Sequence, residues 1–196
     1  MDKKISFTSI EHPDLPGMIF TGRADIPFAA DSSGERTSER KAGRALIASL
    51  CLKVFGDDTV KITGGDNTKP EGKLNGQPLH LSISHTDKGV FAAISIQYKL
   101  GLDVEKCSRE IRDGVSLRMQ NPLEDKSLYE SEPLIRLWTL KEAALKWRGS
   151  GLRFPMKKIS LKKITDHHYK ADFDDGMSVE ICSFEHSGKW ISIAYS

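Results

Sequence analysis

The spacing of apolar residues changes along the chain and separates helical from extended stretches. From about Glu35 to Phe55, apolar residues recur every three to four positions, which places them on one face of a helix. Arg36, Arg40 and Arg44 are also four apart and predict a basic stripe along the same helix. The apolar positions are Leu46, Ile47, Leu50, Cys51 and Val54.

A second helical pattern covers residues 133–149. Pro133 is suited to the start of a helix and Gly149 to its end. Glu142 and Lys146 are four apart, so they share one face. The apolar positions are Leu134, Leu137, Trp138, Ala144 and Leu145.

Other stretches alternate apolar and polar residues, which is typical of half-buried strands. Residues 79–85 and 90–96 form such a pair around the turn 87–89 and predict a hairpin. Residues 1–30, interrupted by three prolines, are expected to be strand and loop, and residues 64–78, rich in Gly, Asn, Pro and Lys, to be loop. Further short strands are expected at residues 60–62, 100–105, 159–164, 177–184 and 190–195.

The two halves of the chain end alike. His85–Ser95 can be laid over His186–Ser196, each a polar turn that leads into an alternating strand. With one long helix in each half, this favours an α+β fold of two similar lobes in a pseudo-twofold arrangement. Each lobe is expected to be a long helix on a small, mostly antiparallel sheet. The lobes would span residues 1–98 and 99–196.

Composition excludes several classes of protein. The 196 residues hold 29 Lys and Arg against 27 Asp and Glu, a formal charge of +2, which excludes a nucleic-acid binder that acts through bulk charge. We expect no membrane span and no secretory signal, because no apolar run is long enough and none follows the N-terminus. Three widely spaced cysteines form no zinc or disulfide pattern and indicate reduced thiols in a cytoplasmic protein.

Three carboxylates are candidates for a metal site. Asp103 and Glu105 lie two apart in a predicted strand and so point to one face, where they repel each other unless a cation lies between them. This pair alone also fits an edge strand with two surface acids, and that interpretation is favoured. Glu142, one turn after Trp138, would add a third ligand and Lys146 a phosphate contact; the alternative is an ordinary ion pair on a helix surface.

Other features are less specific. Gly149 and Gly151 allow a close approach of the backbone to a ligand, although Gly149 also fits a helix cap. His85, at a strand end, can donate to a phosphate, but a lone histidine is more often structural. Four lysines either attract an acidic partner or protect an edge strand from pairing. They are Lys157, Lys158, Lys162 and Lys163.

Taken together, these segments resemble the surfactin-type 4'-phosphopantetheinyl transferases, of the holo-acyl-carrier-protein synthase superfamily. The resemblance rests on Ser84-His85, on Gly101-Leu102-Asp103-Val104-Glu105, and on Trp138-x-x-Lys-Glu-Ala-x-x-Lys146 with Gly149-x-Gly151-Leu152. Their order and spacing match the family over about residues 70–155.

The resemblance implies an enzyme that transfers the phosphopantetheine arm of coenzyme A to a serine of an apo acyl or peptidyl carrier protein and releases adenosine 3',5'-bisphosphate. Asp103, Glu105 and Glu142 would bind Mg²⁺, a hard cation that takes few carboxylates together with phosphate oxygens. Glu142, or a metal-bound water that it orients, would help to deprotonate the serine. Lys146 would stabilise charge on the phosphates.

Besides Lys146, four residues would bind coenzyme A by the same resemblance. Ser84 and His85 would hold its phosphates, Arg44 would face its 3'-phosphate, and Lys73 would lie near the nucleotide. The chain departs from the family at Leu74, where proline is usual, and in residues 107–133, where the family has an aromatic pair near the docked carrier protein. The resemblance therefore leaves the choice of carrier open.

Two other functions fit the same residues. A Mg²⁺-dependent nuclease or other phosphodiesterase would use the three acids with the arginine stripe on nucleic acid, but the even charge balance counts against it. A non-catalytic relative would bind coenzyme A or a carrier protein without transfer. We expect a monomer, because two lobes of one chain suffice to build the site.

Overall fold

The computed structural model describes residues 5–26, 32–64, 68–87 and 89–196. The chain divides into two compact units, Met1–Leu100 and Gly101–Ser196. The sequence placed the join between residues 98 and 99. Each unit combines a long helix with a sheet, so the predicted α+β class is confirmed.

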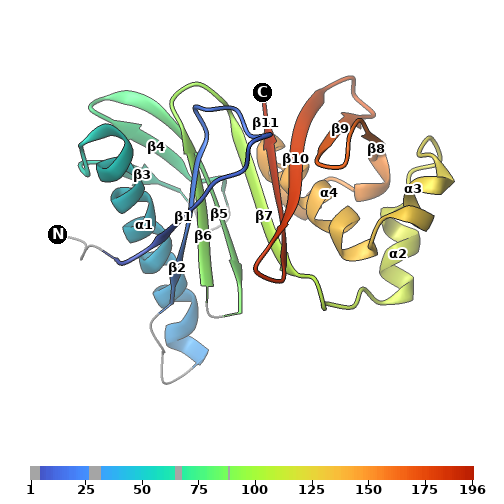
Figure 1. The fold of residues 1–196 in the computed structure, drawn as a ribbon, viewed down its shortest axis with the longest axis horizontal. Coiled ribbons are helices and arrows are strands. Elements are labelled where there is room, and N and C mark those ends of the chain that lie inside the picture. The colour runs from blue at the N-terminus through green and yellow to red at the C-terminus, as the bar shows by residue number, and fades with distance from the viewer. Residues whose placement is uncertain (1–4, 27–31, 65–67, 88) are drawn as a thin grey trace. The chain divides into compact units, whose positions relative to one another are not determined.

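The first unit is a six-stranded sheet in the order β1-β2-β6-β5-β4-β3, with every described neighbour antiparallel. Helix α1 (Ser32–Phe55) crosses one face of this sheet (Figure 1). Its buried Leu46, Ile47 and Leu50 pack with Leu81 and Ile94 of the sheet. The strands are β1 (Thr8–Ile10), β2 (Phe20–Asp25), β3 (Lys61–Thr63), β4 (Glu71–Leu74), β5 (Gln77–Thr86) and β6 (Gly89–Ser95).

The expectation of a loop throughout residues 64–78 is wrong. Strand β4 and the start of β5 lie within it and pair with each other, Leu74 opposite Gln77. Asn75 and Gly76 connect them, with φ of 51° and 79°. Positive φ at both turn residues is the geometry of a two-residue hairpin, for which Asn-Gly is the preferred pair.

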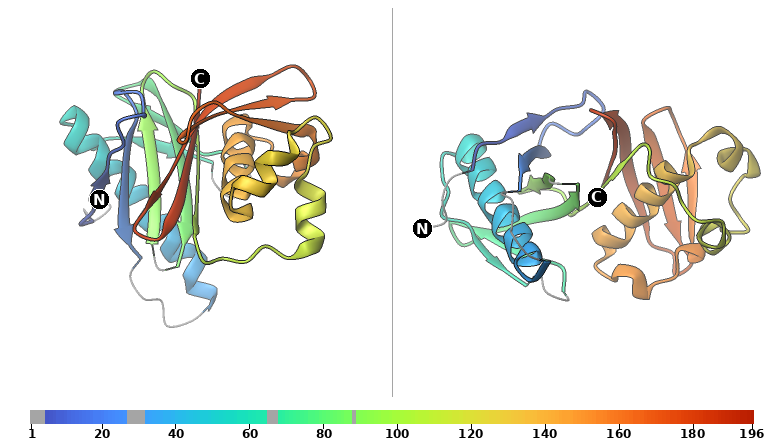
Figure 2. Two further views of the ribbon diagram at one scale, coloured as in Figure 1. Left: turned by 45° about the vertical axis from the view of Figure 1, so that its right-hand side comes forward. Right: turned by 90° about the horizontal axis from the view of Figure 1, so that it is seen from below.

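The second unit is a five-stranded sheet in the order β7-β11-β10-β9-β8. Helix α4 (Leu134–Arg148) lies along this sheet (Figure 2), over β10 and β11. Its cap Gly149 has a φ of 85°, which glycine adopts without strain. The remaining elements are β7 (Leu100–Lys106), β8 (Ile159–Lys163), β9 (His168–Phe173), β10 (Ser178–His186), β11 (Lys189–Tyr195), α2 (Asp113–Met119) and α3 (Lys126–Ser131).

The two hairpins that suggested a duplication are both present, but their overlay is shifted by one residue. Thr86 faces Gly89 in the first hairpin and His186 faces Lys189 in the second. His186 therefore corresponds to Thr86 and not to His85. A shift of one residue in a strand exchanges its two faces, so His85 and His186 are not equivalent positions of the two hairpins.

Two expectations from composition can be compared with the structure. Cys51, Cys107 and Cys182 form no disulfide, and burial raises the pKa of the Cys51 thiol to about 12. Within the described ranges, no helix has both the length and the apolar character needed to cross a membrane.

Candidate functional site

Strand β7 and helix α4 meet at Gly101. A Cβ atom there would lie 2.1 Å from the carbonyl oxygen of Ala143 and 2.3 Å from the backbone nitrogen of Trp147. Only a glycine permits so close an approach of helix to strand. Residues 101, 103 and 105 share one face of β7, so Gly101 allows the helix to lie beside the two carboxylates that follow it.

Asp103, Glu105, Glu142 and Lys146 are brought together by this packing. Asp103 is buried, and Lys146 Nζ lies 2.8 Å from its Oδ1. The spacing of two residues in the strand and four in the helix therefore produces the convergence that the sequence predicted.

The carboxyls of this cluster oppose one another's ionisation. Burial, then the charge of Asp103 and that of Glu105, raise the pKa of Glu142 to about 7, although Lys146 and Arg109 act in the opposite direction. The pKa of Glu105 is also raised, by burial and then by Asp103. The cluster therefore holds more negative charge than its own cations balance.

Arg109 is a member of this cluster that the sequence analysis missed. Its guanidinium forms an ion pair with Glu105 and lies over the ring of Trp138, with 5.7 Å from Cζ to the ring centroid. Arg109 follows β7 in an irregular segment, where no periodicity relates it to the site. Its spacing of four residues from Glu105 is not informative outside a helix.

The donor types, rather than an assembled ligand geometry, suit a hard divalent cation. Three carboxyls face two basic side chains, and carboxylate oxygens are the protein ligands that Mg²⁺ prefers. A cation among them would relieve the mutual repulsion that raises the pKa of Glu142. The ligand roles of Asp103, Glu105 and Glu142 stay a prediction.

Lys141, beside Glu142 in the motif, faces away from the cluster. It is fully buried, 2.7 Å from Glu124 Oε1, and donates to the carbonyl of Ile159 at 2.9 Å. Glu124 in turn accepts from the Tyr129 hydroxyl and the Leu161 amide. The two lysines of the motif therefore differ: Lys141 ties the segment before α3 to α4 and β8, and Lys146 serves the acid cluster.

The first unit brings together two of the four residues predicted to bind coenzyme A. Arg44 and His85 line a small cavity of about 150 Å³, together with Arg40 of the same helix stripe. Arg44 donates to the carbonyls of Ile62 at 2.7 Å and Gly64 at 3.2 Å, which fixes its guanidinium at the cavity. Basic groups in this arrangement suit a phosphate. The other lining residues are Ile62, Gly64, Pro70 and Ile83.

Ser84 and Lys73 do not line this cavity. Ser84 is buried, and because it is next to His85 in β5 the two side chains point to opposite faces of the sheet. Lys73 is exposed on β4, opposite Lys61 of β3. Their contacts with coenzyme A stay predictions.

The predicted lysine patch lies on β8 and the turn before it. Strand β8 is at the edge of its sheet. Lys158 pairs with Asp174 at 2.8 Å, and Lys163 with Glu132 at 2.8 Å. The position and these pairs favour edge protection over attraction of a partner.

Comparison with known proteins agrees with the motifs. The family model of the 4'-phosphopantetheinyl transferase superfamily matches residues 99–194. A 4'-phosphopantetheinyl transferase of Bacillus subtilis is 27% identical over 173 residues, which are 79% of this chain and 76% of that protein. 4'-Phosphopantetheinyl transferase Sfp of Bacillus subtilis strain 168 is 27% identical over 105 residues, 50% of this chain and 46% of Sfp. The matched region contains the whole acid cluster, and the comparisons support the assignment of this region to the 4'-phosphopantetheinyl transferase superfamily.

Proposed function

We propose that this protein transfers the 4'-phosphopantetheine group of coenzyme A to a serine of an apo acyl or peptidyl carrier protein, with Mg²⁺, and releases adenosine 3',5'-bisphosphate. The class of activity is supported by the family match over residues 99–194. The observation that carries the proposal is the cluster of Asp103, Glu105 and Glu142 with Lys146 inside that region.

The acid cluster would hold the cation and manage the proton. Mg²⁺ bound by Asp103, Glu105 and Glu142 would supply charge neutralisation for the pyrophosphate. Lys146, already 2.8 Å from Asp103, would stabilise the negative charge that grows on the leaving phosphate. Glu142, or a metal-bound water that it orients, would accept the proton of the serine hydroxyl.

The arginines of α1 would bind a phosphate at the nucleotide end of coenzyme A. Arg44 is held by two backbone carbonyls, so its guanidinium is positioned before the ligand arrives. Arg40 and His85 line the same cavity and add donors for a phosphate.

Mass spectrometry of an apo carrier protein tests the proposal directly. After incubation with this protein, coenzyme A and Mg²⁺, the carrier should gain the mass of one phosphopantetheine group, and Asp103→Ala or Glu142→Ala should abolish the gain. Asp172→Ala removes an exposed acid of β9 outside the cluster and should leave the rate unchanged. Wild-type rates in both cluster variants would contradict the assignment of the site.

The competing functions give different results in the same experiment. A nuclease would cleave nucleic acid and leave the carrier unmodified, and a non-catalytic relative would bind coenzyme A without any gain of mass. Nothing in the described geometry favours either one. The carrier that is used, the monomeric state and the cytoplasmic location stay predictions.

A further inference from the structure

Arg109 has two partners at the edge of the acid cluster, and they come from different elements. Its guanidinium pairs with Glu105 of β7 and lies over the indole of Trp138 on α4. Trp138 is one helical turn before Glu142, so the guanidinium lies beside the carboxyls. The positive charge of Arg109 also counteracts the rise in the pKa of Glu142.

The Arg109–Glu105 pair can be exchanged for another. The Arg109 side chain is 45% exposed, and ion pairs of that kind are held by about 1 kcal/mol or less. Glu105 is only 17% exposed and borders Asp103, so its carboxylate needs a positive partner. A divalent cation meets that need with twice the charge and uses the same carboxylate oxygens.

The indole offers the guanidinium a second hold that does not depend on Glu105. A cation over an aromatic face is attracted to it, and stacking restricts the side chain to the region near the ring. If Glu105 turns to the cation, Arg109 therefore stays at the site with its fork of donors available. A phosphate oxygen bound beside the cation would then be its natural partner.

We propose that Arg109 is a positioning residue that holds Glu105 while no divalent cation is bound and exchanges it for a pyrophosphate oxygen of coenzyme A when the cation takes Glu105. This inference rests on the proposed function. The guanidinium would thus compete with the cation for Glu105 and would strengthen the binding of coenzyme A. The two binding events are thereby coupled: the cation promotes binding of coenzyme A, and coenzyme A promotes binding of the cation.

Binding measurements without carrier protein test this exchange. Isothermal titration with Mg²⁺ alone is compared for the wild type, Arg109→Ala, Arg109→Lys and Arg112→Ala. Arg112 is an exposed arginine three residues further on and serves as the matched control. Arg109→Ala should bind Mg²⁺ about three- to tenfold more tightly, because a competing positive charge is removed. Arg109→Lys should fall between, and Arg112→Ala within about twofold of the wild type.

The second measurement is titration with coenzyme A at saturating Mg²⁺. Arg109→Ala should bind it about five- to tenfold more weakly, with Arg109→Lys between and Arg112→Ala unchanged. Opposite signs for the two ligands identify the exchange, since a variant with a damaged site would lose affinity for both. Circular dichroism should give the same spectrum for all four proteins.

Four results would overturn the inference. If Arg109→Ala behaves like Arg112→Ala in both titrations, Arg109 does not compete with the cation. If Arg109→Ala binds both ligands more weakly, the role of Arg109 is purely structural. Unchanged affinity for coenzyme A with a raised KM for the carrier protein would assign the guanidinium to an acid of the carrier. Absence of saturable Mg²⁺ binding by the wild type would overturn the cation in the proposed function as well, so the two failures are distinguishable.

Discussion

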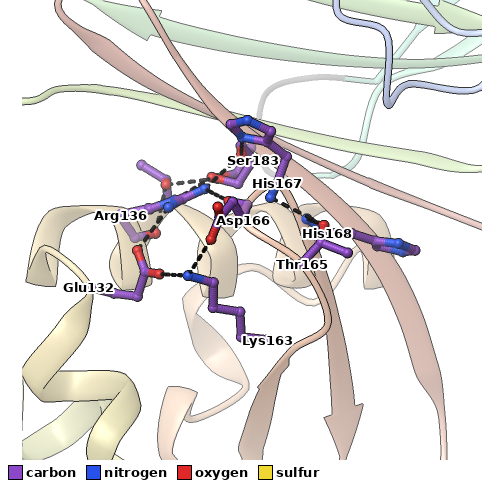
Figure 3. A network of polar contacts seen from close by, with 10 residues as sticks. Glu132, Arg136, Lys163, Thr165, Asp166, His167, His168 and Ser183 are labelled. Atoms are coloured by element: carbon purple, nitrogen blue, oxygen red, sulfur yellow. Dashed lines mark hydrogen bonds and ion pairs between the residues drawn. The ribbon is translucent and has the colours of Figure 1, made fainter.

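Two clusters of charge lie along α4, and they differ in how their charges are matched. Near the start of the helix, buried Arg136 pairs with Glu132 at 2.8 Å, and Glu132 pairs with Lys163 at 2.8 Å (Figure 3). Lys163 also reaches Asp166 at 2.9 Å. Each carboxyl there faces a basic group, whereas further along the helix three carboxyls share Lys146 and Arg109.

The ionisation of the two clusters follows this difference. Burial alone would raise the pKa of Glu132, but the hydrogen bond from Lys163 and the charge of Arg136 outweigh it and lower the pKa below its ordinary value. At Glu142 burial and the neighbouring acids prevail, and the pKa rises to about 7. A balanced cluster stabilises the fold, and an unbalanced one is prepared for a ligand that brings the missing charge.

Among the variants, Asp103→Asn is expected to give the largest effect and tests the difference between the two charge clusters most strongly. Asp103→Asn should lower the rate of phosphopantetheinyl transfer about a hundred- to a thousandfold, because charge on the reacting phosphates loses its counter-ion site. The free energy of unfolding without divalent cations should not fall, since a repelling charge is gone. Transfer rates and urea unfolding in EDTA measure the two. A large loss of stability would class the acid cluster with the Arg136 cluster.

The opposite response is expected at Arg136. Arg136→Met should destabilise the protein by about 3–5 kcal/mol, because buried Glu132 then keeps only the partly exposed Lys163 as a basic partner. The guanidinium also donates to the Ser183 carbonyl and lies 4.4 Å from the centroid of Trp190. Urea unfolding gives the loss. Transfer activity per folded molecule should stay within about twofold of the wild type; a selective loss of activity would show that the cluster takes part in the reaction.

Gly101 tests whether the acid cluster depends on the approach of helix and strand. Gly101→Ala should cost about 1–3 kcal/mol or more, because the added methyl group meets the backbone of Ala143 and Trp147. Gly114→Ala is the control, since a Cβ there meets nothing within 4 Å. The free energies of unfolding of Gly101→Ala and Gly114→Ala, compared with each other, test this expectation. Equal values would show that α4 and β7 adjust without cost.

The two clusters should respond to pH with opposite sign. The ordinary pKa of a glutamate is 4.5 and that of folded Glu142 about 7, so the folded state binds more protons between these values. Without divalent cations, stability from Glu142 should be lost as pH rises from 4.5 to 7, by about 1–3 kcal/mol relative to Glu142→Gln. For Glu132, with a lowered pKa, stability should be lost as pH falls below 4.5, relative to Glu132→Gln.

Urea unfolding in EDTA at pH 3.5, 5 and 7.5 measures both slopes. The difference between wild type and variant cancels the other titrating groups. Slopes of the same sign would contradict the contrast between a balanced and an unbalanced cluster.

The smallest effect is expected where a pair is exposed. Lys158→Ala removes a 2.8 Å contact with Asp174, but the two side chains are 49% and 42% exposed. The free energy of unfolding should change by less than about 0.5 kcal/mol. A larger change would show that a short distance between the charges is sufficient, and that burial does not distinguish the Arg136 cluster from surface pairs.

Local geometry explains which site residues could be predicted. The strand period places Asp103 and Glu105 on one face of β7, and the helix period places Glu142 and Lys146 on one face of α4. The packing of β7 on α4 then brings the two pairs together. Arg109 lies in a segment without a period and reaches the site through tertiary structure alone. The strand period also separates Ser84 from His85, because neighbouring residues of β5 point to opposite faces of the sheet.

The fold was predictable to a similar degree. The long helices and both hairpins have strong patterns, whereas β4 has four residues and is marked chiefly by the turn Asn75-Gly76. Strand β9 alternates Tyr169, Ala171 and Phe173 inward, but charged neighbours and the short spacing conceal it. Short strands depend on their partners in the sheet more than on their own composition.

The order of the second sheet has a consequence for synthesis on the ribosome. Strand β7, which carries Asp103 and Glu105, stands at the end of the sheet and has β11 (Lys189–Tyr195) as its neighbour. At roughly 5–20 residues per second, several seconds pass between the two strands. The acids therefore leave the ribosome long before the strand that fixes them, so the nascent chain assembles its acid cluster only at a late stage.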